Sequence, residues 1–189
     1  MAQTSTTISG QKTFKSAITI NATCTFTSAT KKITASGTSL SDLSVRDLIT
    51  ITGSASNNST FTISEVDANG TFVIVEEDVT SETVAADTVL TYVGFVTAKV
   101  KGDGYYSQTD GLHTVAYHVN ATCTGALKMQ GSLSTTPTED DFFDIDGTTF
   151  TTDQSTTINS VNFTGNFVWV RAKLTANTAG SVTKILFNN

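Results

Sequence analysis

The chain is poor in cysteine, proline, tryptophan and charge. Its 189 residues include two cysteines, one proline and one tryptophan, and only 15% of them are charged. A hydrophobic content of 38% with so little charge argues against intrinsic disorder. No run of about 18 apolar residues occurs, and the net charge of −6 leaves no cluster of positive charge for a nucleic-acid backbone. We therefore expect neither a membrane nor a nucleic acid as a partner.

Hydroxyl side chains are what the sequence has in abundance. It contains 38 threonines and 19 serines, together about 30% of the chain. A helical protein would use more Ala, Glu, Lys and Leu, whereas β-branched threonine suits the half-buried positions of a pleated sheet. The hydroxyls alternate with apolar residues in many short runs, which is the two-residue period of strands. The composition therefore predicts an all-β protein.

The order of these runs predicts an N-terminal extended arm, a small β-barrel-like domain and then an antiparallel β-sandwich. Residues 1–17 are polar and show no sustained period, so we expect an arm outside the core. Short strands fill residues 18–100, and Asn69-Gly70 predicts a tight hairpin turn. The glycines of Lys101–Gly104 predict the domain boundary, and residues 104–189 predict the sandwich.

Residues 163–174 alternate, and the most apolar strand of the chain is expected at residues 166–174. Alternation places Phe167, Trp169 and Arg171 on one face and Val168 and Val170 on the other. Because both faces carry apolar side chains, we expect this strand at the centre of the sandwich, with the Trp169 ring in the core.

The two cysteines occur in the same phrase, Asn-Ala-Thr-Cys-Thr, at residues 21–25 and 120–124. The N-terminus shows neither a basic segment nor an apolar stretch, so no secretory signal is predicted. We expect Cys24 and Cys123 to be free buried thiols, with one disulfide as the alternative. The repeated phrase is compatible with either a duplication or a coincidence.

No catalytic centre or cofactor site is predicted. His113 and His118 are five residues apart on one strand, so they lie on opposite faces and cannot share a metal ion. The Gly-x-Ser-x-Gly elbow of hydrolases does not occur, and no Cys-His pairing is indicated. We expect a protein that is not an enzyme.

An acidic cluster between residues 139 and 147 is the sharpest local charge feature. Carboxylates at this density suit calcium, so the weak metal candidates are Asp140, Asp141, Asp144 and Asp146. The alternative is a solvated loop, in which Asp140 and Asp141 cap a turn after Pro137 and the two following phenylalanines enter the core.

Tyrosines supply the candidate binding surface. Tyr105 and Tyr106 follow Gly104 directly, and with Tyr117 they are the possible glycan-contact residues. Tyrosine rings can stack on sugars, but a pair at a domain junction can equally pack an interface.

Two stretches resemble modules of tailed-bacteriophage virion proteins. Residues 43–53 (LSVRDLITITG), 58–66 (NSTFTISEV) and 71–75 (TFVIV) look like the small SH3-like or barrel modules of such proteins. Residues 105–189 are similar to a β-sandwich domain of structural proteins from marine myovirus-like phages. The segments that carry this likeness are SQTDGLHTV (107–115), MQGSL (129–133), PTEDDFFDI (137–145), NFTGNFVWVRA (162–172) and TKILFN (183–188).

The resemblance implies a non-enzymatic component of the virion exterior that is assembled in the host cytoplasm. We expect a capsid decoration or cement protein that binds the major capsid protein or other virion proteins, as a homo-oligomer with a trimer as a candidate. The alternative is a receptor-binding, glycan-binding or adaptor protein of the tail or baseplate. If the N-terminal arm grips the capsid, deletion of residues 1–17 abolishes attachment and leaves the fold intact.

Overall fold

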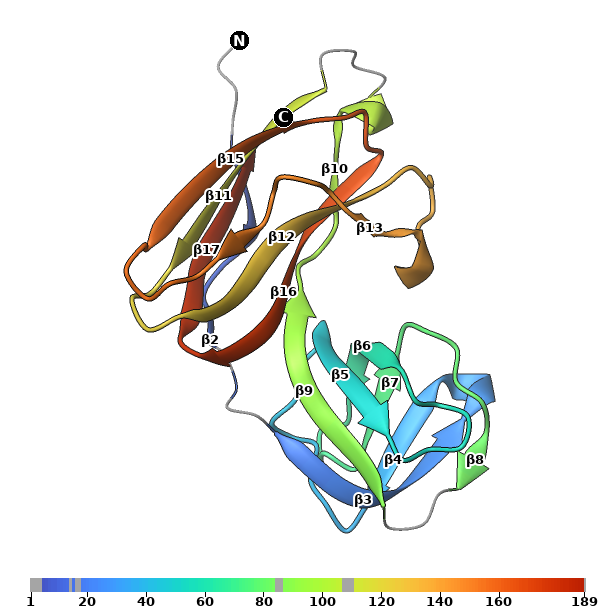
Figure 1. Ribbon diagram of the computed structural model, residues 1–189. Helices are drawn as coiled ribbons and strands as arrows, with labels where there is room; N and C mark the ends of the chain where they lie inside the picture. The colour runs from blue at the N-terminus through green and yellow to red at the C-terminus, as the bar shows by residue number, and fades with distance from the viewer. Residues whose placement is uncertain (1–4, 14, 16–17, 84–86, 107–110, 189) are drawn as a thin grey trace. The chain divides into compact units, whose positions relative to one another are not determined.

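The computed structural model describes residues 5–13, 15, 18–83, 87–106 and 111–188, which divide between two compact units (Figure 1). The barrel unit comprises Ala17–Phe95, and the sandwich unit combines Met1–Ser16 with Val96–Asn189. The predicted all-β class is confirmed, since strands predominate and the helical residues lie in short 3-10 turns. In the described ranges no helix has the length and apolar character needed to cross a membrane.

The barrel unit is a closed antiparallel barrel with the strand order β9-β5-β6-β7-β4-β3 (Figure 1). Strand β3 closes it by pairing with β9 as well as β4, with Ile20 opposite Leu90. The short β8 is added to β3. The bounds are β3 Thr19–Thr27, β4 Lys32–Ser36, β5 Asp47–Thr52, β6 Thr60–Val66, β7 Phe72–Val75, β8 Glu82–Thr83 and β9 Thr88–Val96, with the 3-10 turn η1 at Ser28–Thr30.

The alternation of apolar and hydroxyl residues explains the barrel's core. In β3 the residues Ile20, Ala22, Cys24 and Phe26 are buried, whereas the threonines between them are only partly covered. Asn69-Gly70 forms the predicted turn between β6 and β7, and Gly70 has a φ of +66°. The alternation of apolar and hydroxyl residues therefore predicts the strand β3 correctly, and the Asn-Gly pair predicts the β6–β7 hairpin.

The sandwich unit packs two antiparallel sheets against each other. One has the order β1-β17-β11-β15 with β2 also paired to β17, and the other is built on β12 and β16 with β10, β13 and β14 at their sides. The bounds are β1 Thr6–Ser9, β2 Lys12–Thr13, β10 Val100–Lys101, β11 Leu112–Val119, β12 Thr124–Ser132, β13 Phe143–Asp144, β14 Phe150–Thr151, β15 Ile158–Thr164, β16 Trp169–Ala179 and β17 Ser181–Asn188, with the 3-10 turns η2 at Asp103–Tyr106 and η3 at Glu139–Asp141.

Aromatic rings fill one end of the sandwich core. The buried imidazole of His113 lies 5.1 Å from the Phe163 ring, 5.9 Å from Phe167 and 5.5 Å from Phe187, measured between ring centroids. Its Nε2 is 2.8 Å from the Gly165 carbonyl oxygen. His113 is therefore a buried core residue, and the prediction that His118 lies on the opposite face is confirmed by the alternating burial of β11.

The prediction of an N-terminal arm outside the core is wrong for the residues of this segment that the structure describes. Within residues 1–17, strand β1 pairs with β17 and places Thr7 opposite Leu186, and β2 pairs with the start of the same strand. Ile8 is only 7% exposed. One inward apolar side chain and backbone pairing to a distant strand are enough to hold this segment in the sheet, so its deletion would remove part of the fold.

The alternating residues 163–174 belong to two strands, and the strand predicted at residues 166–174 begins at Trp169. Gly165 has a φ of +153°, and a Cβ there would lie 2.4 Å from the Phe167 ring. The chain turns at this glycine, so β15 ends at Thr164 and β16 begins at Trp169. The break separates Phe167 from the strand alternation: Phe167 is buried, whereas Trp169 is only partly covered and lies outside the core.

Both cysteines are free and buried, which confirms the prediction of two free thiols over that of one disulfide. Burial raises the pKa of the thiols of Cys24 and Cys123, which disfavours the reactive thiolate. The repeated phrase has two different structures. Asn21–Thr25 lies inside β3, whereas residues 120–123 form the turn between β11 and β12 and Thr124 begins β12. The structural contexts therefore favour coincidence.

Candidate functional site

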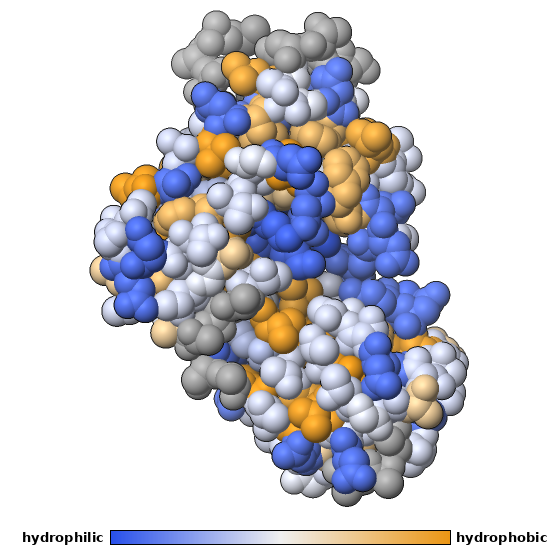
Figure 2. All heavy atoms as spheres, in the orientation of Figure 1, coloured by the Kyte–Doolittle hydropathy of each residue, from blue (hydrophilic) through white to orange (hydrophobic). Residues whose placement is uncertain are grey.

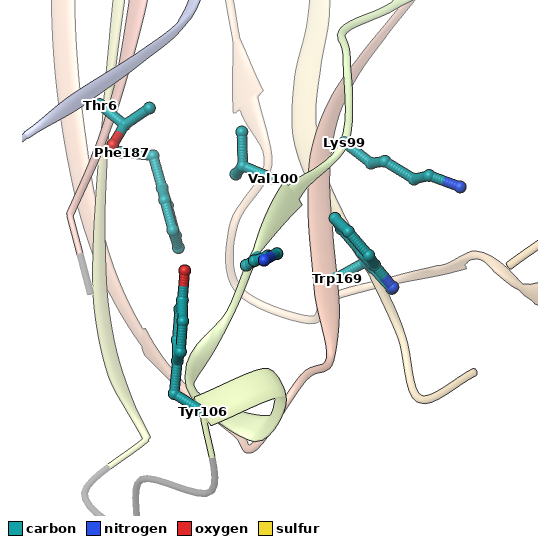
Figure 3. Close-up of a pocket in the computed structure, with 7 residues that line it drawn as sticks. Thr6, Lys99, Val100, Tyr106, Trp169 and Phe187 are labelled. Atoms are coloured by element: carbon teal, nitrogen blue, oxygen red, sulfur yellow. The ribbon is translucent and has the colours of Figure 1, made fainter. Parts of the chain in front are cut away.

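The candidate binding site is a hollow in the sandwich unit beside β10, which we call the aromatic pocket. In β10 and β16, Lys101 pairs with Trp169, so the two side chains leave the sheet on the same face. Tyr106 and Phe187 lie on one side of Val100, and Trp169 and Lys99 lie on the other (Figure 3). The hollow has a volume of about 330 Å³ and is lined by Thr6, Lys99, Val100, Lys101, Tyr106, Trp169 and Phe187.

Two glycines place the tyrosines at this pocket. The N–H of Gly102 donates to the Val168 carbonyl at 3.0 Å, and that of Gly104 donates to the Phe167 carbonyl at 2.9 Å. A Cβ at Gly104 would lie 2.5 Å from the Asn166 carbonyl oxygen. The glycine segment, predicted as a domain boundary, therefore serves close backbone approach inside the sandwich unit, and the change of unit falls earlier, between Phe95 and Val96.

The rings at the pocket form a connected cluster. Tyr105 makes T-shaped contacts with Tyr106 and Trp169, with centroid distances of 5.3 and 5.4 Å. Tyr105 and Tyr106 are 43% and 54% exposed. The indole N–H of Trp169 donates to the Thr135 carbonyl at 3.1 Å. This bond holds the ring against the loop that follows β12. The predicted tyrosine pair thus gains a third ring that the sequence did not assign to it.

Lysine ammonium groups accompany these rings. Lys101 Nζ lies 3.9 Å from the centroid of the Tyr105 ring, and Lys99 Nζ lies 5.4 Å from that of Trp169. Lys99 Nζ also donates to the Pro137 carbonyl at 3.2 Å. Cation–π contacts of this kind hold positive charge at the edge of an aromatic surface.

Tyr117 does not belong to this surface, so its assignment as a glycan contact is wrong. Its side chain is fully buried between the two sheets, 6.2 Å from the Phe150 ring between centroids. Its hydroxyl donates to the Thr148 carbonyl at 2.9 Å, and burial raises the pKa of the phenol. The alternation of β11 explains this, because Tyr117 shares a face with Val115 and Val119.

The acidic cluster is occupied by hydrogen bonds within the chain. Asp141 accepts hydrogen bonds from the N–H and hydroxyl of Thr138, which lower the pKa of its carboxyl and cap η3 as predicted. Asp144 accepts bonds from Lys128 and from Gln130 Nε2, the latter at 2.9 Å. Burial raises the pKa of Asp144, but these bonds outweigh it and hold that pKa below its ordinary value.

The calcium candidates therefore do not converge. Asp140 and Asp146 are exposed, and in the ranges that the structure covers no three His, Cys, Asp or Glu side chains gather in a way that could hold a metal ion. The two phenylalanines also differ from the expectation of a shared core position. Phe142 is half-buried, whereas Phe143 is 44% exposed.

A buried ion pair fastens this loop to the sheet. Arg171 Nη1 lies 2.7 Å from Glu139 Oε1, with the two side chains 6% and 18% exposed. Arg171 Nε donates to Gln130 Oε1 at 2.9 Å, and the guanidinium lies 3.8 Å from the centre of the Phe142 ring. Figure 2 shows the hydrophilic side chains gathered over β12, β13 and β16. The network fixes the loop that carries Thr135 and Pro137, the partners of Trp169 and Lys99.

A second surface, which we call the outer sheet face, is formed by the outward side chains of β11, β15 and β17. Cross-strand pairing aligns Leu186, Ala116 and Ser160 in one row and Asn188, Thr114 and Asn162 in the next. A shallow hollow of about 200 Å³ lies over Thr114, Ala116 and Leu186. Among the outward positions of these strands, the titratable side chains are His118 and Lys184, which are paired at one end of the face.

The pair at the end of this face gives a testable pH effect. Burial lowers the pKa of His118, and the charge of Lys184 lowers it further. Lys184→Gln is therefore expected to raise the pKa of His118 without restoring the ordinary value of about 6.5. Because the folded-state pKa is depressed, this histidine's contribution to stability is complete above about pH 6.5 and is lost as the pH falls through the folded-state pKa. NMR titration of the imidazole protons measures the shift, and an unchanged pKa in Lys184→Gln contradicts the prediction.

Gly104→Ala tests the close approach that builds the pocket. The added Cβ would meet the backbone oxygen of Asn166, so we expect a loss of about 1–3 kcal/mol and a displaced η2. Trp169 is the only tryptophan, so its emission reports the loss of the Tyr105 contact. Gly10→Ala is the control, since a Cβ there meets nothing within 4 Å. Equal emission spectra for the two variants contradict the prediction.

Comparisons with protein-family models, with curated protein sequences and with solved structures find no match to this chain. The aromatic pocket and the outer sheet face are therefore the structural observations on which a function can be argued.

Proposed function

We propose that this chain is a non-enzymatic structural protein on the exterior of a tailed-phage virion, where it acts as a capsid decoration protein. The likeness of both stretches of the sequence to phage virion modules supports the location. The outer sheet face supports the mode of action, because the core of a protein–protein interface is depleted in charged side chains. We assign capsid binding to this face and no longer to the N-terminal arm.

The rows of this face suit docking against another protein. Alanine, serine, threonine and asparagine are short, and Thr114 Oγ1 donates to Asn162 Oδ1 at 2.9 Å, so neighbouring side chains hold one another in place. Leu112 and Ile158 are 52% and 57% exposed on the same pair of strands. Their burial against a capsid subunit would add apolar area, and binding across subunits would favour the assembled shell by mass action.

Co-sedimentation with virus particles tests the decoration function. The wild-type protein is expected to sediment with particles of the phage that encodes it after its own copies are stripped. Ala116→Glu with Ser160→Glu places two like charges opposite each other on the face, so the bound fraction should fall about tenfold or more. Thr52→Glu, at an exposed strand position of the barrel unit, is the matched control and should bind normally.

Two results would contradict this proposal. Undiminished binding of the doubly charged variant would exclude the outer sheet face, and a reconstruction of the native particle without this protein on the head would exclude capsid decoration. Light scattering of the purified protein tests the expected homo-oligomer, for which a trimer would suit quasi-three-fold positions.

A receptor-binding or glycan-binding protein of the tail or baseplate is the second candidate. The observation that favours it is the exposed pair Tyr105 and Tyr106 in ring contact with Trp169. Amphipathic aromatic rings of this kind are common at binding surfaces. Density for the protein at the tail, together with sugar binding that is lost in Tyr105→Ala and Tyr106→Ala, would favour this function over capsid decoration.

A further inference from the structure

We propose that the aromatic pocket binds an acidic sugar residue of a polysaccharide, with the rings against the sugar's C–H face and the lysines beside its carboxylate. The inference rests on the second candidate function and adds the charge of the ligand to it. It does not depend on where in a virion the protein lies.

The shape of the pocket suits one or two sugar rings. Its volume of about 330 Å³ is at the lower end of the range of small-molecule sites. Tyr106 and Trp169 lie on opposite sides of Val100, so the lining offers an aromatic ring on each side of β10 against which a sugar ring can pack (Figure 3). The hydroxyls of Thr6 and Tyr106 belong to residues of the lining and can exchange hydrogen bonds with sugar hydroxyls.

The charge of the pocket is opposite to that of the chain. Lys99 and Lys101 both line it, and its seven described lining residues include no Asp or Glu. The chain as a whole carries a net charge of −6. A positive pocket in an acidic protein attracts anions to one place and leaves the remaining surface unfavourable to them.

The fixed positions of the lysines support selectivity. Each ammonium group lies over an aromatic ring, Lys101 over Tyr105 and Lys99 over Trp169. A ligand that contacts the rings therefore meets the charges at the same time. Single-stranded nucleic acid also combines flat rings with negative charge, but it requires a positively charged groove that follows the backbone. Two lysines in an acidic chain do not supply such a groove, so we favour a sugar acid.

Titration of the full chain with matched oligosaccharides tests the proposal. An oligogalacturonate and a neutral oligogalactose of equal length are compared by calorimetry and by the emission of Trp169, the only tryptophan. We expect the acidic sugar to bind about tenfold more tightly at low salt, as two partly exposed ion pairs would give, and this preference to shrink at high salt. Polyglutamate and an oligothymidylate serve as anionic ligands without a sugar acid.

Variants separate the two parts of the site. Lys99→Gln with Lys101→Gln is expected to abolish the roughly tenfold preference, so that the acidic and the neutral sugar bind with equal affinity, whereas Tyr106→Ala should weaken the binding of both sugars and keep the preference. Lys32→Gln is the matched control, because Lys32 Nζ lies 5.1 Å from the Phe72 ring centroid in the barrel unit. Circular dichroism verifies that each variant is folded.

Each outcome decides a separate point. Equal affinity for the acidic and the neutral sugar overturns the acidic ligand but leaves a glycan-binding function. Binding of neither sugar overturns both. Equal or tighter binding of polyglutamate or of oligothymidylate shows that the site recognises negative charge or nucleic acid rather than a sugar acid, and this too overturns the proposal.

Discussion

Replacing Tyr117 with alanine is expected to lower the free energy of unfolding of the sandwich unit by about 3–5 kcal/mol, the usual cost of deleting a buried aromatic side chain. The ring is fully buried and lies against Phe150, and its hydroxyl donates to the Thr148 carbonyl. Tyr117→Phe keeps the ring and loses only the hydrogen bond, so about 1–3 kcal/mol is expected for it. Denaturant titration followed by Trp169 emission reports on the unit that contains both residues.

Tyr105→Ala is the matched control for this experiment. Tyr105 is 43% exposed, so its removal should cost far less stability than removal of Tyr117 while affecting sugar binding. If instead Tyr117→Ala left the free energy of unfolding unchanged and abolished sugar binding, Tyr117 would belong to the binding surface and this prediction would be wrong.

The burial of Tyr117 was within reach of the sequence. Two-residue alternation in His113–Val119 places Tyr117 with Val115 and Val119, and the structure follows that alternation along β11. The same rule located most strands of both units, because one face of each strand is buried and its apolar residues recur with period two. In β11 the rule assigns core and surface correctly at every position.

The rule fails where the chain leaves the strand. The backbone turn at Gly165 separates Phe167 from the strand that begins at Trp169. An alternation of buried and exposed positions that is continued through this turn therefore places Trp169 wrongly in the core. Strand β1 was missed for a related reason. Ile8 is its one buried apolar residue, and its place depends on pairing with β17, nearly the whole chain away. Edge strands with little local signal are specified by their partners.

The aromatic pocket could be predicted only in part. The tyrosine pair and the glycines before it are adjacent in sequence, so a local pattern predicts both. Trp169 joins them because β10 pairs with β16 and sets Lys101 opposite Trp169, a register that no local pattern encodes. The site therefore arises where a local motif meets a long-range strand pairing.

Arg171→Met is expected to destabilise the sandwich unit by about 3–5 kcal/mol, because it removes one member of a buried ion pair. Methionine replaces much of the apolar length of the side chain, but Glu139 and Gln130 both lose a charged donor in a region with little solvent. Arg171→Lys keeps the charge without the guanidinium's planar set of donors, so an intermediate loss is expected. Thermal or denaturant unfolding measures these differences.

A double-mutant cycle separates the ion pair from the packing of the loop. If the cost of Arg171→Met comes from the charge left on Glu139, then adding Glu139→Gln should recover part of the lost stability, and the effects of the two substitutions should not be additive. Additive losses would contradict this and assign the cost to the contact between Arg171 and Phe142. The loop held by Arg171 supplies the carbonyl acceptors of Trp169 and Lys99. Arg171→Met should therefore also weaken ligand binding at the aromatic pocket, which Arg171 does not line.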